Sequence, residues 1–487
     1  MDVIEAFLQS GTAGRLRMAR DAANTPALRA HFGEAAYEEY LRMAQRLDEG
    51  HLSVTHPVNL VFIPGVMGSL LQSRTKGGVW WIDARTRAHI DDLRLSDDGT
   101  RDADVNNAIV PFSTDPSYEP FLSAVLDRDD FGHEVFAYDW RKPLSLSAAA
   151  LRNLVRSTYE TNGGEPVHIV AHSMGGLMLR AALLAHGEEL WPILGRIVFI
   201  GTPHYGSPAI AGYLKNHLWG FEAIALLGMY LSRETFRSLR GVLELLPAPH
   251  GVYPGTRKDD LLPWRPQGSA GAYVHPCAGF DPYDAAAWEL DLTSGQTAQL
   301  QSALDAVAQF HRRLYEAHEA LAQDLRDRML VIAGVGYKTL FRLAPASRLL
   351  GLWETIEKIT DRVPGDPHRD GDGRVPLASA ALEYVAIRYV RGVHGGLPNI
   401  PAVYADVFRW LNGKGLQLPD LPEGALGSHL GSDATESDAP QLDGSAAAIG
   451  DDPALWQPGQ PDAAAFASLE ARLDSGQMPE FTRVRLL

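Results

Sequence analysis

Short apolar runs alternate with helical patterns along most of this chain, and that alternation restricts the folds open to it. Between the runs, apolar residues recur at the three- and four-residue spacing of a helix with one buried face. Runs of this kind are typical of strands buried on both sides, so the pattern predicts an α/β fold with a mostly parallel, doubly wound sheet. The runs lie at 59–65, 133–140, 166–172, 194–203, 328–336 and 383–390.

One connection between the predicted strands is far longer than an ordinary crossover. More than a hundred residues separate Pro203 from Arg328, and they include a Pro-rich stretch at 245–266 and a helical pattern near 297–325. This length predicts a cap inserted into the sheet domain. The expected division is a helical extension at 1–56, an α/β core at 57–203 and 327–413, a cap at 204–326, a flexible Gly-, Ser- and Asp-rich linker at 414–452 and a tail at 453–487.

The charge and the cysteine content exclude several classes of function. Sixty acidic and 44 basic residues give a net charge of −16, which argues against nucleic acid as a partner and against electrostatic binding to anionic membranes. The single cysteine, Cys277, allows neither an intrachain disulfide nor a cysteine metal cluster. The first 20 residues lack the apolar run of a signal peptide, and the most apolar stretch, 223–232, is about half the length of a membrane span. We therefore expect a soluble, cytoplasmic protein.

A serine stands at one of the predicted strand–helix junctions, in the sequence AHSMGG at 171–176. An abrupt turn from strand to helix leaves little room around Ser173, and Ala171, Gly175 and Gly176 supply small neighbours. The pattern is typical of a nucleophile elbow, although Ala171 replaces the usual first glycine. Taken alone, these residues are equally compatible with a serine that caps an ordinary helix.

A nucleophilic serine needs a base and an acid that orients the base, and both are expected after later strands of the sheet. Asp372 follows the run at 328–336, and His394 follows the run at 383–390. Serine, acid and histidine then occur in the order that α/β-hydrolases use. The alternatives to these two residues are Asp370 as the acid and His172, His204 or His368 as the base, and the side chain of His172 is expected to point away from the nucleophile.

Backbone N–H groups are expected to stabilise the oxyanion that forms when the serine attacks a carbonyl. One donor is the residue after the nucleophile, Met174, and the other belongs to the loop after the first strand. The sequence PGVMGSLL at 64–71 supplies such a loop and points to Val66. The alternative is that this stretch is a plain glycine-rich turn.

The sequence predicts no metal site and no cofactor. The motif DGDG at 370–373 resembles the start of a calcium loop. Arg374, however, stands close to where a third oxygen ligand would be required, so the motif does not predict calcium binding.

Several short motifs follow one another between residues 57 and 412: PGVMGSLL, the Trp80–Trp81 pair, YDWRKPL, AHSMGG, IGTPHYGS, LLPAP, GDGRVP and VHGG. In this order they resemble the lecithin:cholesterol acyltransferase family, which includes phospholipid:diacylglycerol acyltransferases and lysosomal phospholipases. The resemblance implies an α/β-hydrolase fold and fatty acyl esters of lipids as substrates. The mammalian members carry disulfides, one of which closes a lid, and this chain has none. The implied site consists of Ser173 as nucleophile, Asp372 as acid, His394 as base, and the Val66 and Met174 N–H groups as oxyanion donors.

An apolar segment of the predicted cap, HLWGFEAIALLGMYL at 217–231, carries one formal charge, Glu222. We expect it to line a channel for an acyl chain through Trp219, Phe221 and Leu227, because ligand pockets are mostly apolar. The alternative is that the segment packs on the sheet domain as ordinary core. An apolar cap also leaves room for transient contact with a membrane or micelle.

Three functions are compatible with these observations. The first is a serine esterase of the lipase or phospholipase kind, in which an acyl-enzyme is released by water. The second is an acyltransferase that passes the same acyl group to an alcohol. The third is a binding protein on a hydrolase fold, which an intact set of site residues argues against.

Overall fold

The computed structural model describes residues 2–47, 57–81, 83–216, 232–257, 275–277, 280–337, 339–340 and 370–422, together with residue 471. Most of the predicted linker and tail, and the apolar segment 217–231, lie outside the described residues.

Six parallel strands form the central sheet, and their order along the sheet is β5-β1-β6-β7-β8-β9. All five neighbouring pairs are parallel, as the continuous apolar runs predicted. This sheet, with helices on both faces, gives the chain an α/β-hydrolase fold. The strands are β1 (Val58–Ile63), β5 (Gly132–Val135), β6 (Val167–His172), β7 (Leu194–Ile200), β8 (Met329–Val335) and β9 (Ala386–Arg391).

Two strands are shorter than the apolar runs that predicted them. The run at 133–140 leaves the sheet after Val135, and the Tyr138 N–H donates instead to the Ser69 Oγ at 3.1 Å. The run at 383–390 enters the sheet only at Ala386, because Tyr384 has a φ of 59° and turns the chain. In the first case a side-chain hydrogen bond replaces sheet pairing, and in the second a local turn precedes the strand.

Helices cover both faces of the sheet. The helices α7 (Ala148–Thr161) and α8 (Met174–Leu190) pack against each other. The first joins β5 to β6 and the second joins β6 to β7, so both crossovers run toward the β9 edge of the sheet. The helix α6 (Glu119–Leu126) precedes β5, which lies in the other direction from β1. Right-handed crossovers therefore place α6 on the opposite face from α7 and α8. The last helix, α16 (Pro401–Leu411), shares the face of α6, since Phe408 stacks on Phe121 with ring centroids 6.5 Å apart.

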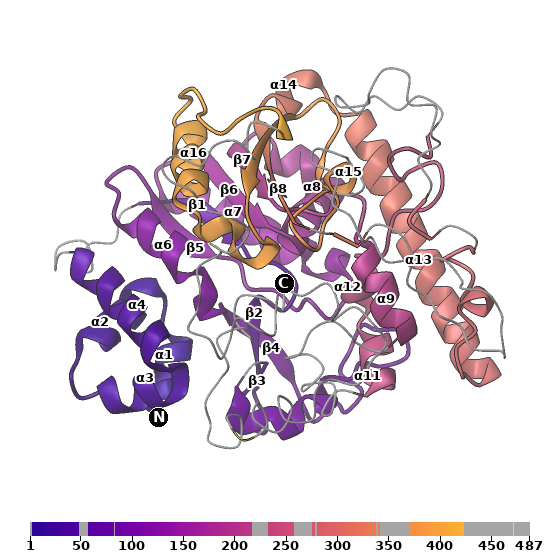
Figure 1. Cartoon of the computed structure of the whole chain (residues 1–487), viewed down its shortest axis with the longest axis horizontal. Coiled ribbons are helices and arrows are strands. Elements are labelled where there is room, and N and C mark those ends of the chain that lie inside the picture. The colour runs from indigo at the N-terminus through magenta and orange to yellow at the C-terminus, as the bar shows by residue number, and fades with distance from the viewer. Residues whose placement is uncertain are drawn as a thin grey trace.

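The N-terminal helices form a bundle with its own apolar core at one side of the sheet domain (Figure 1). They are α1 (Val3–Gln9), α2 (Thr12–Arg20), α3 (Thr25–Phe32) and α4 (Glu34–Arg46). A buried ion pair joins the bundle to α6, with the Arg15 Nη1 2.6 Å from the Glu119 Oε1. Arg15 also donates to the Thr114 carbonyl at 2.9 Å, so one buried side chain connects the two parts.

A second, antiparallel sheet was not foreseen from the sequence. Its order is β3-β2-β4, with β2 at Ser69–Ser73, β3 at Val79–Trp81 and β4 at Ile109–Thr114. Such short strands give too little alternation to be recognised by their pattern. The β2 strand begins directly after the loop that follows β1, so this small sheet holds the far end of that loop.

The long connection between β7 and β8 is mostly helical where it is described. Its helices are α9 (Pro208–Asn216), α11 (Arg233–Ser238), α12 (Arg240–Leu243), α13 (Ser294–Glu319) and α14 (Gln323–Arg326). The long α13 runs along the outer side of the molecule (Figure 1) and contacts α8. A capping box at Thr293 and Gln296 fixes where α13 begins.

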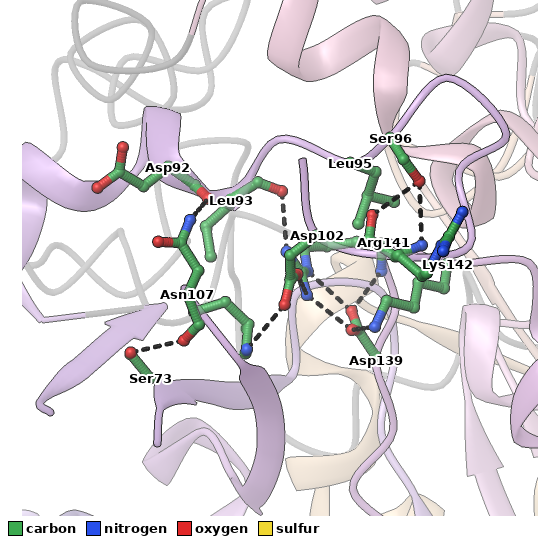
Figure 2. A network of polar contacts seen from close by, with 12 residues as sticks. Ser73, Asp92, Leu93, Leu95, Ser96, Asp102, Asn107, Asp139, Arg141 and Lys142 are labelled. Atoms are coloured by element: carbon green, nitrogen blue, oxygen red, sulfur yellow. Dashed lines mark hydrogen bonds and ion pairs between the residues drawn. The ribbon is translucent and has the colours of Figure 1, made fainter. Parts of the chain in front are cut away.

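A buried arginine of the YDWR motif organises the connection between β3 and β4 (Figure 2). The Arg141 guanidinium lies 2.7 Å from the Asp139 Oδ2 and 2.9 Å from the Asp102 Oδ1, and it donates to the Leu93 carbonyl at 2.9 Å. The Arg141 carbonyl accepts from the Gly241 N–H at 2.8 Å. The Arg141 side chain thus connects the segment after β5 with the 83–108 segment, and the Arg141 backbone carbonyl contacts α12. Burial by itself would raise the pKa of Asp139, but the charges and hydrogen bonds of Arg141 and Lys142 together outweigh burial, so the pKa is lowered.

A buried carboxyl follows α12 without a cation to compensate its charge. The Glu244 Oε2 accepts a hydrogen bond from the Leu144 N–H at 2.9 Å, and no basic side chain of the described residues forms an ion pair with it. Burial raises the pKa of Glu244 to about 8, from an ordinary value of 4.5. Between pH 4.5 and about 8, Glu244 is therefore protonated in the folded chain and ionised in the unfolded chain.

The stability of the fold is expected to fall as the pH rises from about 4.5 to 8, because the folded state must either hold this proton or bury a charge. Glu244→Gln removes the ionisation and should gain stability over the wild type, by on the order of 4 kcal/mol at pH 8 and little at pH 4.5. Urea unfolding at several pH values measures the difference. Glu188→Gln, at an exposed position of α8, is the matched control. Equal pH slopes for the wild type and Glu244→Gln would contradict this assignment.

Candidate active site

Ser173 occupies a strained turn between β6 and α8. Its φ of 53° and ψ of −126° are rare for a residue with a side chain, and strain of this kind is a feature of the nucleophile elbow. The small neighbours are required by close approach: a Cβ at Gly175 would clash with the Ile63 carbonyl, and a Cβ at Gly176 would clash with the Thr202 side chain. The turn therefore presents the Ser173 hydroxyl at the carboxyl end of the sheet.

The structure brings the predicted nucleophile, base and acid into one hydrogen-bonded row. The Ser173 Oγ lies 2.8 Å from the His394 Nε2, and the His394 Nδ1 lies 2.7 Å from the Asp372 Oδ2. All three side chains are buried. The backbone reinforces the row, because the His394 N–H donates to the Asp372 carbonyl at 2.9 Å.

Backbone groups hold the acid in its orientation. The Asp372 Oδ1 accepts hydrogen bonds from the Arg374 N–H at 2.9 Å and the Val375 N–H at 2.7 Å, which leaves Oδ2 to face His394. Room for the carboxylate comes from Gly334, where a Cβ would approach the Asp372 Cβ to 2.6 Å. The two carboxylate oxygens therefore have different and fixed partners.

The alternative site residues lie elsewhere. The Asp370 Oδ1 accepts from the Gly336 N–H at 2.8 Å and from the Gly371 N–H at 2.9 Å, so this carboxylate holds the loop and does not reach the histidine. His204 is buried beside Phe199, and neither of its ring nitrogens has a hydrogen-bond partner among the described residues. His172 does not bond the Ser173 hydroxyl, and His368 lies outside the described residues.

The loop after β1 lies against the nucleophile, as its predicted role requires. A Cβ at Gly65 would come within 2.9 Å of the Ser173 Cβ, so only a glycine permits this approach. The Gly68 N–H donates to the Gly65 carbonyl at 3.1 Å and closes a turn in which Met67 has a φ of 60°. Within the described part of the chain, nothing accepts a hydrogen bond from the Val66 N–H.

Met174 is the first residue of α8, where N–H groups have no partner within the helix. The positive end of the helix dipole lies at the same place and favours negative charge. Val66 follows the glycine that approaches Ser173, and Met174 follows Ser173 directly in the chain. Their role as oxyanion donors stays a prediction.

Tyr118 is a site residue that the sequence reasoning missed. It lies in the short 3-10 helix Pro116–Tyr118, after β4, and its hydroxyl accepts from the Gly65 N–H at 3.1 Å. No motif surrounds it, and an Asp-Pro turn before a helix carries no catalytic signal. Only the folded chain shows that this hydroxyl reaches the loop after β1.

Three further residues that the sequence analysis singled out lie outside the described part of the chain. Trp219, Phe221 and Leu227, the expected lining of an acyl channel, lie outside the described residues. Within the described ranges, no group of three or more His, Cys, Asp or Glu side chains is placed to hold a metal ion. Of the helices described, none is both long and apolar enough to cross a membrane. Cys277 is buried and free.

Comparison with known proteins shows which family this chain resembles. The phospholipase A(1) LCAT3 of Arabidopsis thaliana is 21% identical over 295 residues, which cover 57% of this chain and 65% of that protein. Residues 133–258 match the sequence profile of the lecithin:cholesterol acyltransferase family. Over this segment the chain is similar to the lecithin:cholesterol acyltransferase family. The profile match includes Ser173 and the motifs YDWRKPL, IGTPHYGS and LLPAP but ends before Asp372 and His394, so the fold alone joins these two residues to the matched segment.

A second relative is an uncharacterized protein of Saccharomyces cerevisiae, YJR098C, which is 25% identical over 166 residues, or 32% of this chain and 24% of that protein. The chain thus spans less than two thirds of the length of either curated relative.

Among solved structures, the Tle4–Tli4 complex shares 16% identity over 74% of this chain and 98% of the matched chain, with a TM-score of 0.46. The mature Bacillus licheniformis lipase BlEst2 shares 14% identity over 73% of this chain and 92% of that one, with a TM-score of 0.34. Both scores are below 0.5, so the fold assignment rests on the strand order and the crossovers described above.

Proposed function

We propose that this chain is a serine hydrolase that cleaves fatty acyl esters of lipids through an acyl-enzyme. The observation that carries the proposal is the row of Ser173, His394 and Asp372 at the carboxyl end of the sheet, with distances of 2.8 and 2.7 Å. A lipid ester as substrate is supported by the similarity to the lecithin:cholesterol acyltransferase family and to a phospholipase A(1).

The hydrogen bonds determine which proton moves. The Asp372 carboxylate accepts a hydrogen bond from the His394 Nδ1–H, so the Nε2 lone pair faces the Ser173 hydroxyl. When Ser173 Oγ attacks the ester carbonyl, Nε2 takes its proton and the imidazolium is stabilised by Asp372. The carbonyl oxygen becomes negative and accepts from the Val66 and Met174 N–H groups.

The tetrahedral intermediate then breaks down and releases the alcohol, which takes the proton from the His394 Nε2. The acyl group remains on Ser173 Oγ. His394 next removes a proton from water, which attacks the acyl-enzyme, and it then gives this proton to Ser173 Oγ as the bond to the acyl group breaks and the fatty acid leaves. If an alcohol takes the place of water, the same residues carry out acyl transfer, and the family includes enzymes of both kinds.

A panel of esters with product analysis tests the proposal. The purified chain is incubated with phospholipid, with triacylglycerol and with p-nitrophenyl esters from acetate to octanoate, with and without a long-chain alcohol. We expect free fatty acid as the main product and a catalytic efficiency that rises steeply with chain length, since each buried methylene contributes about 0.8 kcal/mol.

The outcomes separate the readings. Equal cleavage of acetate and octanoate esters would contradict a lipid substrate and indicate a small-ester hydrolase. A predominance of the alcohol ester over free acid would assign the chain as an acyltransferase. No cleavage of any ester would indicate a binding protein on a hydrolase fold.

A further inference from the structure

Three buried hydrogen bonds connect the loop after β1 with the backbone of His394. The Gly65 N–H lies 3.1 Å from the Tyr118 Oη, the Tyr118 Oη lies 2.8 Å from the His172 Nδ1, and the His172 Nε2 lies 3.0 Å from the His394 carbonyl. These residues come from four separate segments of the chain. Nothing in the ester cleavage proposed above uses Tyr118 or the ring of His172.

The chemistry of each group fixes the direction of every bond. The Gly65 N–H can only donate and the His394 carbonyl can only accept. With a neutral phenol and a neutral imidazole, the imidazole proton lies on Nε2 and is donated to the His394 carbonyl. Tyr118 then accepts from the Gly65 N–H and gives its single proton to the His172 Nδ1.

Burial keeps both groups in those states. Tyr118 and His172 are buried, and burial raises the pKa of the phenol and lowers the pKa of the imidazole well below its ordinary value, with His394 lowering it further. Neither group is therefore expected to change charge in the range in which esterases work.

Other contacts hold the later residues of the loop that follows β1. The bond to Tyr118 holds the part of this loop that lies next to Ser173. The Met67 carbonyl accepts from the Trp81 Nε1 at 2.9 Å, and the Gly68 carbonyl accepts from the Asp115 N–H at 2.8 Å. A Cβ at Gly68 would come within 3.0 Å of the Tyr118 Oη, so the turn wraps closely around this hydroxyl. Loss of the hydroxyl would leave the buried Gly65 N–H without an acceptor, next to Val66.

We propose that Tyr118 and His172 are positioning residues that set the oxyanion-binding loop at Gly65–Val66 relative to the base His394, through one continuous chain of hydrogen bonds. This inference rests on the proposed function. Neither side chain contacts the substrate in this role. They keep the loop at Gly65–Val66 and the base His394 at the separation that a tetrahedral intermediate requires.

Tyr118→Phe tests the proposal, because it removes the hydroxyl and keeps the ring that packs on Phe62. Tyr138→Phe is the matched control: Tyr138 is equally buried, and its hydroxyl has no hydrogen-bond partner in the described part of the chain. We expect Tyr118→Phe to lower kcat on p-nitrophenyl esters by about 10- to 100-fold with KM nearly unchanged, since loss of a whole oxyanion donor costs about 10²- to 10³-fold. Tyr138→Phe should stay within about two-fold of the wild type.

A pair of substrates distinguishes positioning of the oxyanion loop from a general loss of structure. A thionoester places sulfur, a poor hydrogen-bond acceptor, where the oxyanion would form, so the wild type should prefer the oxygen ester strongly. Tyr118→Phe should lose activity on the oxygen ester and little on the thionoester, so the ratio of the two rates falls. A structural defect would lower both rates by the same factor.

His172→Gln provides a second, independent measurement, since its amide can still donate to the His394 carbonyl but no longer accepts from Tyr118. It should reproduce the fall in the rate ratio, and the double variant should be no more than about two-fold slower than the slower single variant, because the two side chains act as one unit. If Tyr118→Phe does not fold, His172→Gln is judged by the same ratio.

The outcomes separate this inference from the proposed function. An active wild type with an unchanged rate ratio in Tyr118→Phe and in His172→Gln would overturn the positioning role and leave the serine hydrolase intact. A wild type that cleaves neither kind of ester would overturn both.

Discussion

Ser173→Ala is expected to abolish ester cleavage while the chain stays folded. The substitution removes the atom that forms the acyl-enzyme, and the loss of such a nucleophile lowers kcat by about 10⁴- to 10⁶-fold. Among the described residues, Ser173 Oγ bonds only to the His394 Nε2, so the unfolding free energy should change by about 1 kcal/mol. Steady-state kinetics and thermal unfolding measure the two effects.

A fluorophosphonate probe gives a second measurement that needs no knowledge of the substrate. It should label the wild type and leave Ser173→Ala unlabelled, because the reagent traps a nucleophilic serine. Ser157→Ala, at an exposed position of α7, should be labelled like the wild type and serves as the control. Turnover near the wild-type level in Ser173→Ala on every ester that the chain cleaves would remove Ser173 from the mechanism.

Asp372→Asn is expected to lower turnover by up to about 10⁴-fold with little change in stability. The structure supplies the reason, because the Arg374 and Val375 N–H groups hold one side-chain oxygen of residue 372. The asparagine oxygen would take that position, and its amide nitrogen would then donate to the His394 Nδ1. The imidazole proton would be forced onto Nε2, where it blocks acceptance of the Ser173 proton.

Asp370→Asn is the matched comparison, two residues away on the same loop. Its carboxylate accepts from the Gly336 and Gly371 N–H groups, and an asparagine oxygen can take over that acceptor role. We expect a loss of activity of less than about ten-fold. A larger effect from Asp370→Asn than from Asp372→Asn would reverse the assignment of the acid.

Much of the fold could be predicted from local patterns, because a parallel strand that is buried on both faces requires consecutive apolar residues. The apolar runs before Gly65 and before Ser173 became β1 and β6, and the small residues after Ser173 became the elbow. The three-stranded antiparallel sheet was not visible in this way. Its strands are three to six residues long, and long-range pairing rather than pattern holds them in place.

The sequence by itself determined the strand order in the chain, the strained position of Ser173 and the candidates for acid and base, because each depends on neighbours within a few residues. The choice between Asp370 and Asp372 was decided only by tertiary structure, since the two differ in which backbone N–H groups surround them after folding. The same holds for Tyr118, which lies 54 residues from His172 along the chain and 2.8 Å from its Nδ1 in the fold. Hydrogen bonds between distant segments leave no periodicity in a sequence, so only the folded chain reveals them.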